Sequence, residues 1–184
     1  MSEQSFALIE TAIGWVGIAW SKRGLTQVQL PERDREATRR RLLKRAGEAV
    51  ERVPEGRIAE AAALIGRYAA GERVSFAEVP LDLAGVDAFR LAIYEAARQL
   101  GFGETTTYGG LASAAGHPGE ARETGQALGQ NPVPIIVPCH RILAAGNKIG
   151  GFSAPGGAAT KARLLGMEGV RTGPPAATQS SFGF

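Results

Sequence analysis

Residues 107–141 read TYGGLASAAGHPGEARETGQALGQNPVPIIVPCHR, and this stretch indicates both the fold and the candidate site. Its first part predicts two short helices separated by the break HPG, which is the pattern of a helix-turn-helix. Its second part is aliphatic and rich in proline, and it ends with Cys139, His140 and Arg141. Cys139 is the only cysteine of the 184 residues, and His140 is one of two histidines.

A lone cysteine is most often a small buried hydrophobe, but its neighbours here favour a reactive thiol. His140 can act as a general base toward Cys139 only across a tight turn or through a water, because adjacent side chains of a strand point to opposite faces. A third group would have to orient the imidazole. Glu168, in the apolar segment LLGMEG, is one candidate, and a surface carboxylate at a helix end is its other interpretation.

The residues alone leave the reaction of Cys139 open. Acyl transfer would need an oxyanion hole and a fate for the acyl-enzyme. Alkyl transfer would leave a stable thioether, and one protein molecule would then react once. Asn131 precedes Pro132, so it favours a turn that shapes the cysteine segment.

The chain divides by pattern into two predicted domains and a tail. Residues 1–80 predict an α/β N-terminal domain, a small sheet plus helices, with strands in IGWVGIAW and LTQVQL and helices over 35–50 and 56–71. The first helix would place Leu42, Leu43, Ala46 and Val50 on one face. After a connector near 80–85, residues 85–170 predict a mostly helical C-terminal domain with the helix-turn-helix, and residues 171–184 a disordered tail.

Composition excludes several classes of protein. The net charge of +3 is low for a binder that relies on phosphate neutralisation alone. A single cysteine rules out a multi-thiol zinc site, the glycine-rich segments match no nucleotide-binding motif, and no metal or cofactor is expected. No apolar run is long enough for a membrane span and the N-terminus does not read as a secretory signal, so we expect a cytoplasmic, nucleoid-accessible protein.

The segment NPVPIIVPCHRI closely resembles the active-site signature of the O6-alkylguanine-DNA alkyltransferases, also called methylated-DNA–protein-cysteine methyltransferases. The resemblance covers about residues 85–170 through FGETTTYGGLA, GEARETGQALGQNP, GNKIGGFSAPGG and KARLLGMEG, and it covers residues 1–80 only loosely. It implies direct repair of double-stranded DNA by a monomer. The alkyl group of a flipped O6-alkylguanine would move irreversibly to Cys139, in a single turnover.

The resemblance also implies roles for individual residues. His140 is similar to the family's water-linked base, Glu168 to the carboxylate that orients it, and Asn131 to the residue that holds the helix pair against the cysteine segment. Tyr108 is similar to the tyrosine that rotates the nucleotide out and protonates the leaving guanine. Further implied residues are the arginine finger Arg122, the small Ala121 and Gly125 that allow close approach to the minor groove, and Val137, Phe152 and Ser153 of the substrate pocket.

Some residues depart from the family pattern. Glu123 and Thr124 stand where small apolar residues are common, and a carboxylate that faces phosphate would weaken DNA binding. Phe152 replaces an aromatic residue that commonly carries a hydroxyl, and the segment FSAPGG is about two residues longer than many family loops.

Three other functions remain open from the sequence. A lesion sensor on the same fold would bind alkylated DNA without transfer. A cysteine hydrolase would turn over an ester or an amide at Cys139 and His140. A helix-turn-helix regulator would read bases with polar residues of its second helix, such as Glu123 and Gln126.

Overall fold

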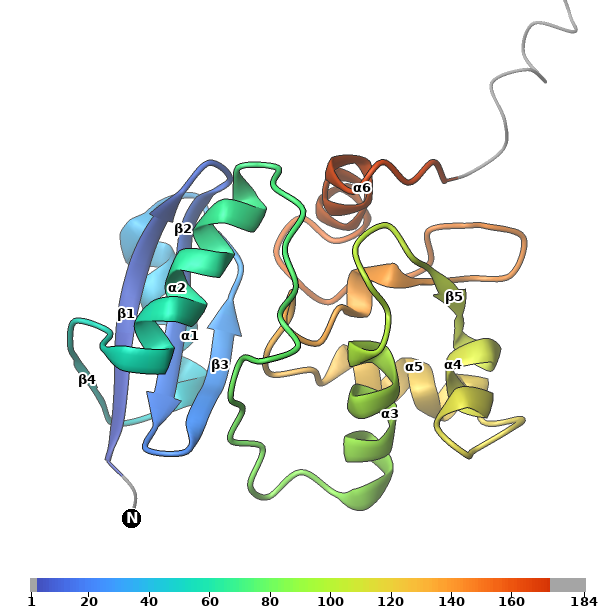
Figure 1. The fold of residues 1–184 in the computed structure, drawn as a ribbon, viewed down its shortest axis with the longest axis horizontal. Coiled ribbons are helices and arrows are strands. Elements are labelled where there is room, and N and C mark those ends of the chain that lie inside the picture. Colours follow the sequence, from blue (N-terminus) through green and yellow to red (C-terminus); the bar gives the residue numbers. More distant parts are fainter. Residues whose placement is uncertain (1–2, 173–184) are drawn as a thin grey trace, which may run out of the picture.

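The computed structural model describes residues 3–172 and consists of a sheet layered between two helices, followed by a helical half that holds the cysteine segment (Figure 1). The strands of the sheet lie in the order β3-β2-β1-β4. Their bounds are β1 Gln4–Thr11, β2 Gly14–Ser21, β3 Gly24–Gln29 and β4 Ala49–Glu51. The β1–β2 and β2–β3 pairs are antiparallel, and β4 runs parallel to β1. An α/β N-terminal part is therefore present, as predicted.

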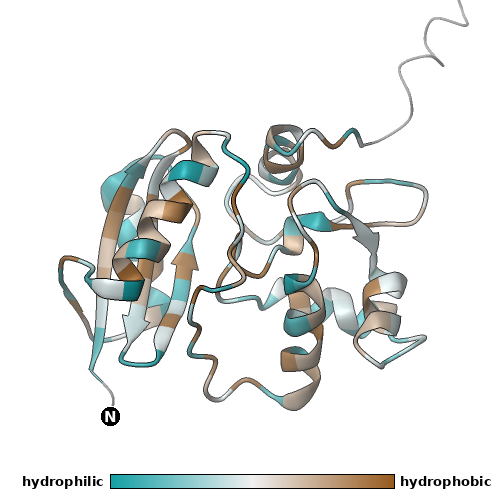
Figure 2. Ribbon diagram, in the orientation of Figure 1, coloured by the Kyte–Doolittle hydropathy of each residue, from teal (hydrophilic) through white to brown (hydrophobic). Residues whose placement is uncertain are grey.

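Helices α1 (Arg35–Ala46) and α2 (Gly56–Ala69) cover the two faces of this sheet (Figure 1). Leu42 of α1 packs with Phe6 and Ala19 in a small cluster, whereas α2 joins the main core of the molecule. Hydrophobic and hydrophilic residues alternate in bands along α2 (Figure 2), and its buried residues include Ile65 and Tyr68. Both faces of the sheet are thus removed from water.

Two sequence predictions about this half were wrong. The first helix ends at Ala46, because Gly47 adopts a positive φ of 68° and donates its N–H to the carbonyl of Leu43. Val50 therefore lies in β4, where it is 47% exposed, and is not on the apolar face of a helix. Strand β1 was not predicted at all, although it lies in the interior of the sheet.

Gly24, the first residue of β3, occupies a position that requires glycine. Its φ is 152°, and a Cβ there would come within 2.5 Å of the carbonyl group of Pro80. Pro80 belongs to the connector that follows α2, and its carbonyl accepts a hydrogen bond from Leu25 N–H at 2.9 Å. The connector can therefore pack on strand β3 only because residue 24 has no side chain.

The second half is mostly helical, as predicted. It contains α3 (Ala88–Arg98), α4 (Tyr108–Ala114), α5 (Ala121–Gly129), α6 (Ala158–Met167), and a short parallel pair of strands, β5 (Thr106–Thr107) and β6 (Ile142–Leu143). Asp87 caps α3 by accepting from Arg90 N–H at 2.9 Å. Helices α4 and α5 pack on each other as the helix pair that the sequence indicates.

The two halves share one hydrophobic core, which contains Val28 of β3, Ile65 of α2 and Leu128 of α5. Edge strand β3 also pairs directly with the cysteine segment, because Val28 N–H donates to the carbonyl of Pro132 at 2.8 Å. The division near residues 80–85 stays a prediction, and the tail predicted for 171–184 falls largely outside the described residues. Among residues 3–172, no helix is both long and apolar enough to cross a membrane.

Candidate active site

The cysteine segment is folded as a series of turns that one asparagine fixes. Asn131 accepts from Val133 N–H at 3.0 Å and donates to the carbonyl of Val137 at 2.9 Å. Between them Ile135 has a positive φ of 76°, an unfavourable conformation for a β-branched residue. The segment ends in a 3₁₀ turn, η1 (Cys139–Arg141), so Cys139 and His140 are not strand neighbours. The required tight turn is therefore present.

Glu168 lies immediately after α6, and its carboxylate forms hydrogen bonds with four other residues. Its Oε2 accepts from Tyr68 Oη at 2.6 Å and lies 2.5 Å from Nε2 of His140. Its Oε1 accepts from Arg141 Nε and from Gly103 N–H, both at 2.8 Å. The carboxylate is 0% exposed, so the interpretation of Glu168 as a surface group is wrong.

These contacts define the protonation state of the group. Burial raises the pKa of Glu168, but the hydrogen bonds from His140, Arg141 and Tyr68 outweigh it and lower the pKa to about 2. Burial lowers the pKa of His140 below its ordinary value. A neutral His140 that donates from Nε2 to this carboxylate has an unprotonated Nδ1. Nδ1 is buried and has no partner among the described residues, so it can accept a proton.

Cys139 is only 8% exposed. Burial raises the pKa of its thiol, while hydrogen bonding to Asn131 and the charge of Lys161 act in the opposite direction. Lys161 is itself buried, and its Nζ donates to the carbonyl of Ile142 at 2.5 Å and lies 5.7 Å from the centre of the Tyr108 ring. The thiol is consequently protonated at rest and needs a base when it reacts.

A cavity of about 340 Å³ opens onto Cys139 from the side of helix α5. Four residues predicted for the site line it, namely Tyr108, Gly125, Phe152 and Ser153, together with Leu128, Gly129 and Gly151. Burial raises the pKa of Tyr108, so its hydroxyl stays protonated and can donate. The cavity is large enough for a nucleobase-sized group placed between a hydrogen-bond donor and the sulfur.

The remaining predicted nucleic-acid contacts lie around a broad surface hollow of about 620 Å³ next to this cavity. Tyr108 and Gly125 line both, and Ala121 and the exposed Arg122 line the hollow. Thr124 is fully buried, and its hydroxyl donates to the carbonyl of Glu120 at 2.8 Å, so its side chain is not on the exposed face of α5. Glu123 is exposed.

Among residues 3–172, two cavities reach Cys139, one of about 340 Å³ and one of about 20 Å³. Val137 is the one predicted pocket residue that lines neither of them. It is fully buried, and its carbonyl instead accepts from Asn131. The described residues contain no group of three His, Cys, Asp or Glu side chains that could hold a metal ion. His117 lies 2.8 Å from Glu120 within the helix-turn-helix turn.

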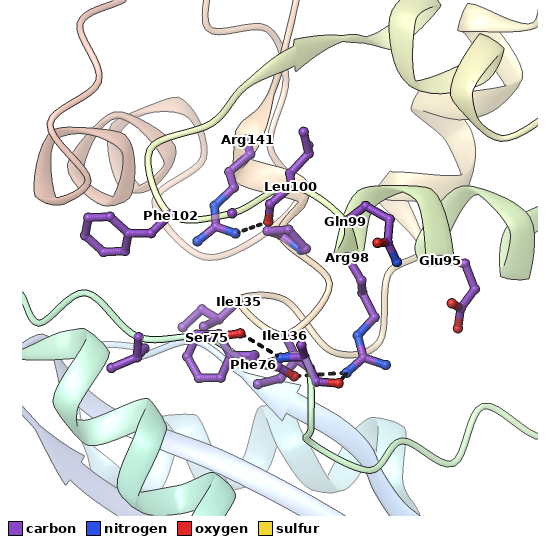
Figure 3. A pocket seen from close by; sticks show the side chains of 14 residues that line it. Ser75, Phe76, Glu95, Arg98, Gln99, Leu100, Phe102, Ile135, Ile136 and Arg141 are labelled. Atoms are coloured by element: carbon purple, nitrogen blue, oxygen red, sulfur yellow. Dashed lines mark hydrogen bonds between the residues drawn. The ribbon is translucent and has the colours of Figure 1, made fainter.

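A further cavity, of about 300 Å³, lies between the connector and the end of α3, and Cys139 is not among its lining residues (Figure 3). Two arginines form hydrogen bonds between residues that line this cavity. Arg98 donates to the carbonyl of Phe76 at 3.0 Å, and Arg141 donates to the carbonyl of Leu100 at 2.7 Å. Arg141 thus connects a wall of this cavity to Glu168.

Sequence reasoning missed two residues of the site and the partner of a third. Tyr68 was taken only as part of α2, yet a tyrosine on the buried face of a helix needs a partner for its hydroxyl, and that signal was available. Lys161 carries no sequence signal of its burial, because its contacts, Ile142, Gly151 and the Tyr108 ring, come from other parts of the chain. Arg141 was expected beside the thiol, and its ion pair with Glu168 was not foreseen.

The chain is similar in sequence and in fold to known proteins. Residues 88–170 match the family model described as "6-O-methylguanine DNA methyltransferase, DNA binding domain". The methylated-DNA–protein-cysteine methyltransferase of Mycobacterium leprae is 35% identical over 161 residues, which are 87% of this chain and 89% of that protein. The methylated-DNA–protein-cysteine methyltransferase of Mycolicibacterium paratuberculosis is 41% identical over 104 residues, which are 56% of this chain and 61% of that protein.

A solved structure has the same fold. The crystal structure of Mycobacterium tuberculosis OGT in complex with DNA superposes with a TM-score of 0.73 at 32% sequence identity. The match covers 89% of this chain and 92% of that one, so it includes the sheet half as well as the helical half.

Proposed function

Because this chain belongs to the methylated-DNA–protein-cysteine methyltransferase family, we propose that it repairs DNA by transferring the alkyl group of O6-alkylguanine to Cys139. The observation that carries the proposal is the position of Cys139. Cys139 lines a cavity of about 340 Å³ that adjoins helix α5, and the residue that follows it, His140, is paired with the buried Glu168. The reaction is irreversible and ends with one alkyl group per protein molecule.

The proposed reaction starts with the thiol proton. Nδ1 of His140 takes this proton, through a bridging water, and Glu168 stabilises the imidazolium that forms. The sulfur then forms a bond to the alkyl carbon, the bond from that carbon to O6 breaks, and the electron pair goes to guanine. Tyr108 donates a proton to the leaving guanine, and its hydroxyl regains one from solvent when His140 releases the proton it took.

The base reaches Cys139 by leaving the double helix. Helix α5 and the hollow beside it would face the minor groove, with Arg122 occupying the place of the extruded base. Ala121 and Gly125 are small enough for the backbone to approach DNA closely. Ser153 and Phe152 would close over the flipped base. Glu123 is exposed on the same helix, where it would reduce the affinity for phosphate.

Intact-protein mass spectrometry tests the proposal. Wild-type protein incubated with a duplex that carries O6-methylguanine should gain one methylene mass and no more, whatever the excess of DNA. The variant Cys139→Ser and an unmodified duplex are the controls, and neither should give a gain. A bound but unrepaired duplex, with no mass change in the wild type, would instead make this chain a lesion sensor.

A further inference from the structure

Helix α1 concentrates the positive charge of this protein. It holds six of the chain's 21 Lys and Arg residues and one of its 18 Asp and Glu residues, so the rest of the chain has fifteen positive and seventeen negative side chains. A DNA duplex carries about one negative charge per 1.7 Å of its axis. The low net charge of +3 therefore hides one helix that suits a polyanion.

The second half of α1 carries charge that the protein does not compensate. In the first half, Arg35 lies 2.9 Å and Arg39 lies 3.7 Å from a carboxylate oxygen. Arg41 reaches the carboxylate of Glu32 only at 4.0 Å, and Arg45 forms no ion pair with any residue of the range 3–172. Residues four apart share one side of a helix, so these last two guanidinium groups are together available to an external anion.

Arg41 and Arg45 also lie beside the candidate active site. Both are exposed, and both line the cavity of about 20 Å³ that reaches Cys139. The segment 152–155 lines the same cavity. Two residues of this segment also line the cavity of about 340 Å³, together with Gly125 of α5. Segment 152–155 is thus next to the two arginines through one cavity and next to α5 through the other.

A flipped base brings phosphates to this place. The base stays attached to its own strand, so the phosphates on both sides of the flipped nucleotide remain near the mouth of the cavity that it enters. Helix α5 carries one arginine and one glutamate, so it offers these phosphates no net positive charge. Arginine binds phosphate through two parallel hydrogen bonds as well as by charge. The second half of α1 has the chemistry that α5 lacks.

We propose that Arg41 and Arg45 bind backbone phosphates of the strand that carries the lesion, so that the DNA interface extends from α5 across segment 152–155 onto the sheet half. The inference rests on the proposed function. Contacts to phosphate fix the position of the duplex and do not depend on base sequence or on the lesion. They therefore add affinity for any duplex.

The dependence of DNA affinity on salt tests this interface. For a short unmodified duplex, the slope of log affinity against log salt should become shallower by about 0.9 for each phosphate contact that is lost. Arg41→Gln and Arg45→Gln should each lose one contact. Each variant should bind about 8-fold more weakly than the wild type at about 0.1 M NaCl and equally well near 1 M. Wild-type slopes in both variants would refute the interface.

Arg57→Gln and Arg67→Gln are the matched controls. Both residues are exposed in α2, which covers the other face of the sheet (Figure 1), and each change removes the same charge. Their slopes should equal that of the wild type. Arg41→Lys keeps the charge and should also keep the slope. If the α2 variants lowered the slope as much as the α1 variants, overall charge alone would explain the effect and the interface would be refuted.

Transfer from a duplex with O6-methylguanine separates this interface from the proposed function. With subsaturating duplex, Arg41→Gln and Arg45→Gln should slow transfer in proportion to their loss of affinity. Saturating duplex should restore the single-turnover rate, because the phosphate contacts do not involve the reacting atoms. A rate that stays low at saturation would mean that the arginines shape the site, which refutes the interface. A wild type that binds duplex but transfers no methyl group refutes the proposed function, and the salt slopes still decide the interface.

Discussion

Tyr68 is the residue through which the sheet half contacts the reacting groups. It lies in α2, is fully buried, and donates to Glu168 Oε2 at 2.6 Å while its oxygen is 3.2 Å from Nε2 of His140. Burial and the charge of Glu168 raise its pKa, so the phenol keeps its proton. We regard it as a positioning residue that holds the carboxylate in line with the imidazole.

Replacing Tyr68 by phenylalanine should lower the single-turnover rate about tenfold, because one hydrogen bond to a charged group, worth about 1.5 kcal/mol, no longer holds Glu168 in place. The pH profile of the rate should shift along with it, since His140 loses part of its orientation. Tyr94→Phe is the matched control: it also removes a buried hydroxyl, one that donates to the carbonyl of Ala127 at 2.7 Å. Equal losses in both variants would mean that Tyr68 only stabilises the fold.

Glu168 should govern stability in acid. Its pKa is about 2 in the folded protein against an ordinary 4.5, so its contribution is complete above pH 4.5 and is lost as the pH falls from there toward 2. The lost contribution amounts to about 3 kcal/mol. Urea unfolding at a series of pH values should give a steeper fall in this range for the wild type than for Glu168→Gln. Parallel curves would contradict the assignment.

At the scale of elements, α5 carries both the exposed arginine and a wall of the cavity at Cys139. A Cβ added at Gly125 would lie 3.7 Å from the ring of Tyr108, which is an ordinary contact. The helix therefore has no steric need for glycine at this position. An alanine at position 125 would, however, fill space beside the ring of Tyr108.

Gly125→Ala should accordingly stabilise the protein by about 0.5–1 kcal/mol and still react more slowly. We expect the rate on O6-methylguanine duplex to fall about ten- to hundredfold, because the base or the Tyr108 ring must shift by up to about 1 Å. Gly66→Ala in α2 is the control, since a Cβ there meets nothing within 4 Å. It should give the gain in urea stability with no change in rate.

The elements also show how far sequence reasoning reaches. Helices with an apolar face, such as α2, were predicted because their periodicity is a local signal. The end of α1 was misplaced, since Gly47 in the motif AGE gives a weaker signal than the apolar residues around it. His140 and Glu168 were joined only by resemblance and Tyr68 was missed, because these three residues are far apart in the chain and no local pattern connects them. Strand β1 was missed because its apolar residues form one continuous run, Phe6 to Ile9, without alternation.

For the whole molecule, the sheet half and the helical half are held together by main-chain bonds as well as by the common core. Val28 bonds to Pro132, and Asp82 N–H donates to the carbonyl of Leu25 at 2.8 Å. The predicted boundary near residues 80–85 thus falls where the connector is bonded to β3. An interface of this kind couples the unfolding of the two halves.

We therefore expect one unfolding transition. Trp15 and Trp20 both lie in β2, so tryptophan fluorescence reports the sheet half, whereas residual transfer activity reports the helical half. In urea, the two midpoints should coincide. Separate midpoints, with fluorescence lost first and activity retained, would mean that the halves are independent domains.

The covered thiol has a consequence for how the protein ages. Cys139 is 8% exposed and burial raises the pKa of its thiol, so it presents little thiolate to peroxide or to small electrophiles. Within a chain that has a single cysteine, no neighbouring thiol could reverse such an oxidation through a disulfide. The low reactivity of the resting thiol thus preserves the sulfur for its one reaction. The burial that slows the thiol also lengthens the time over which the protein can still react.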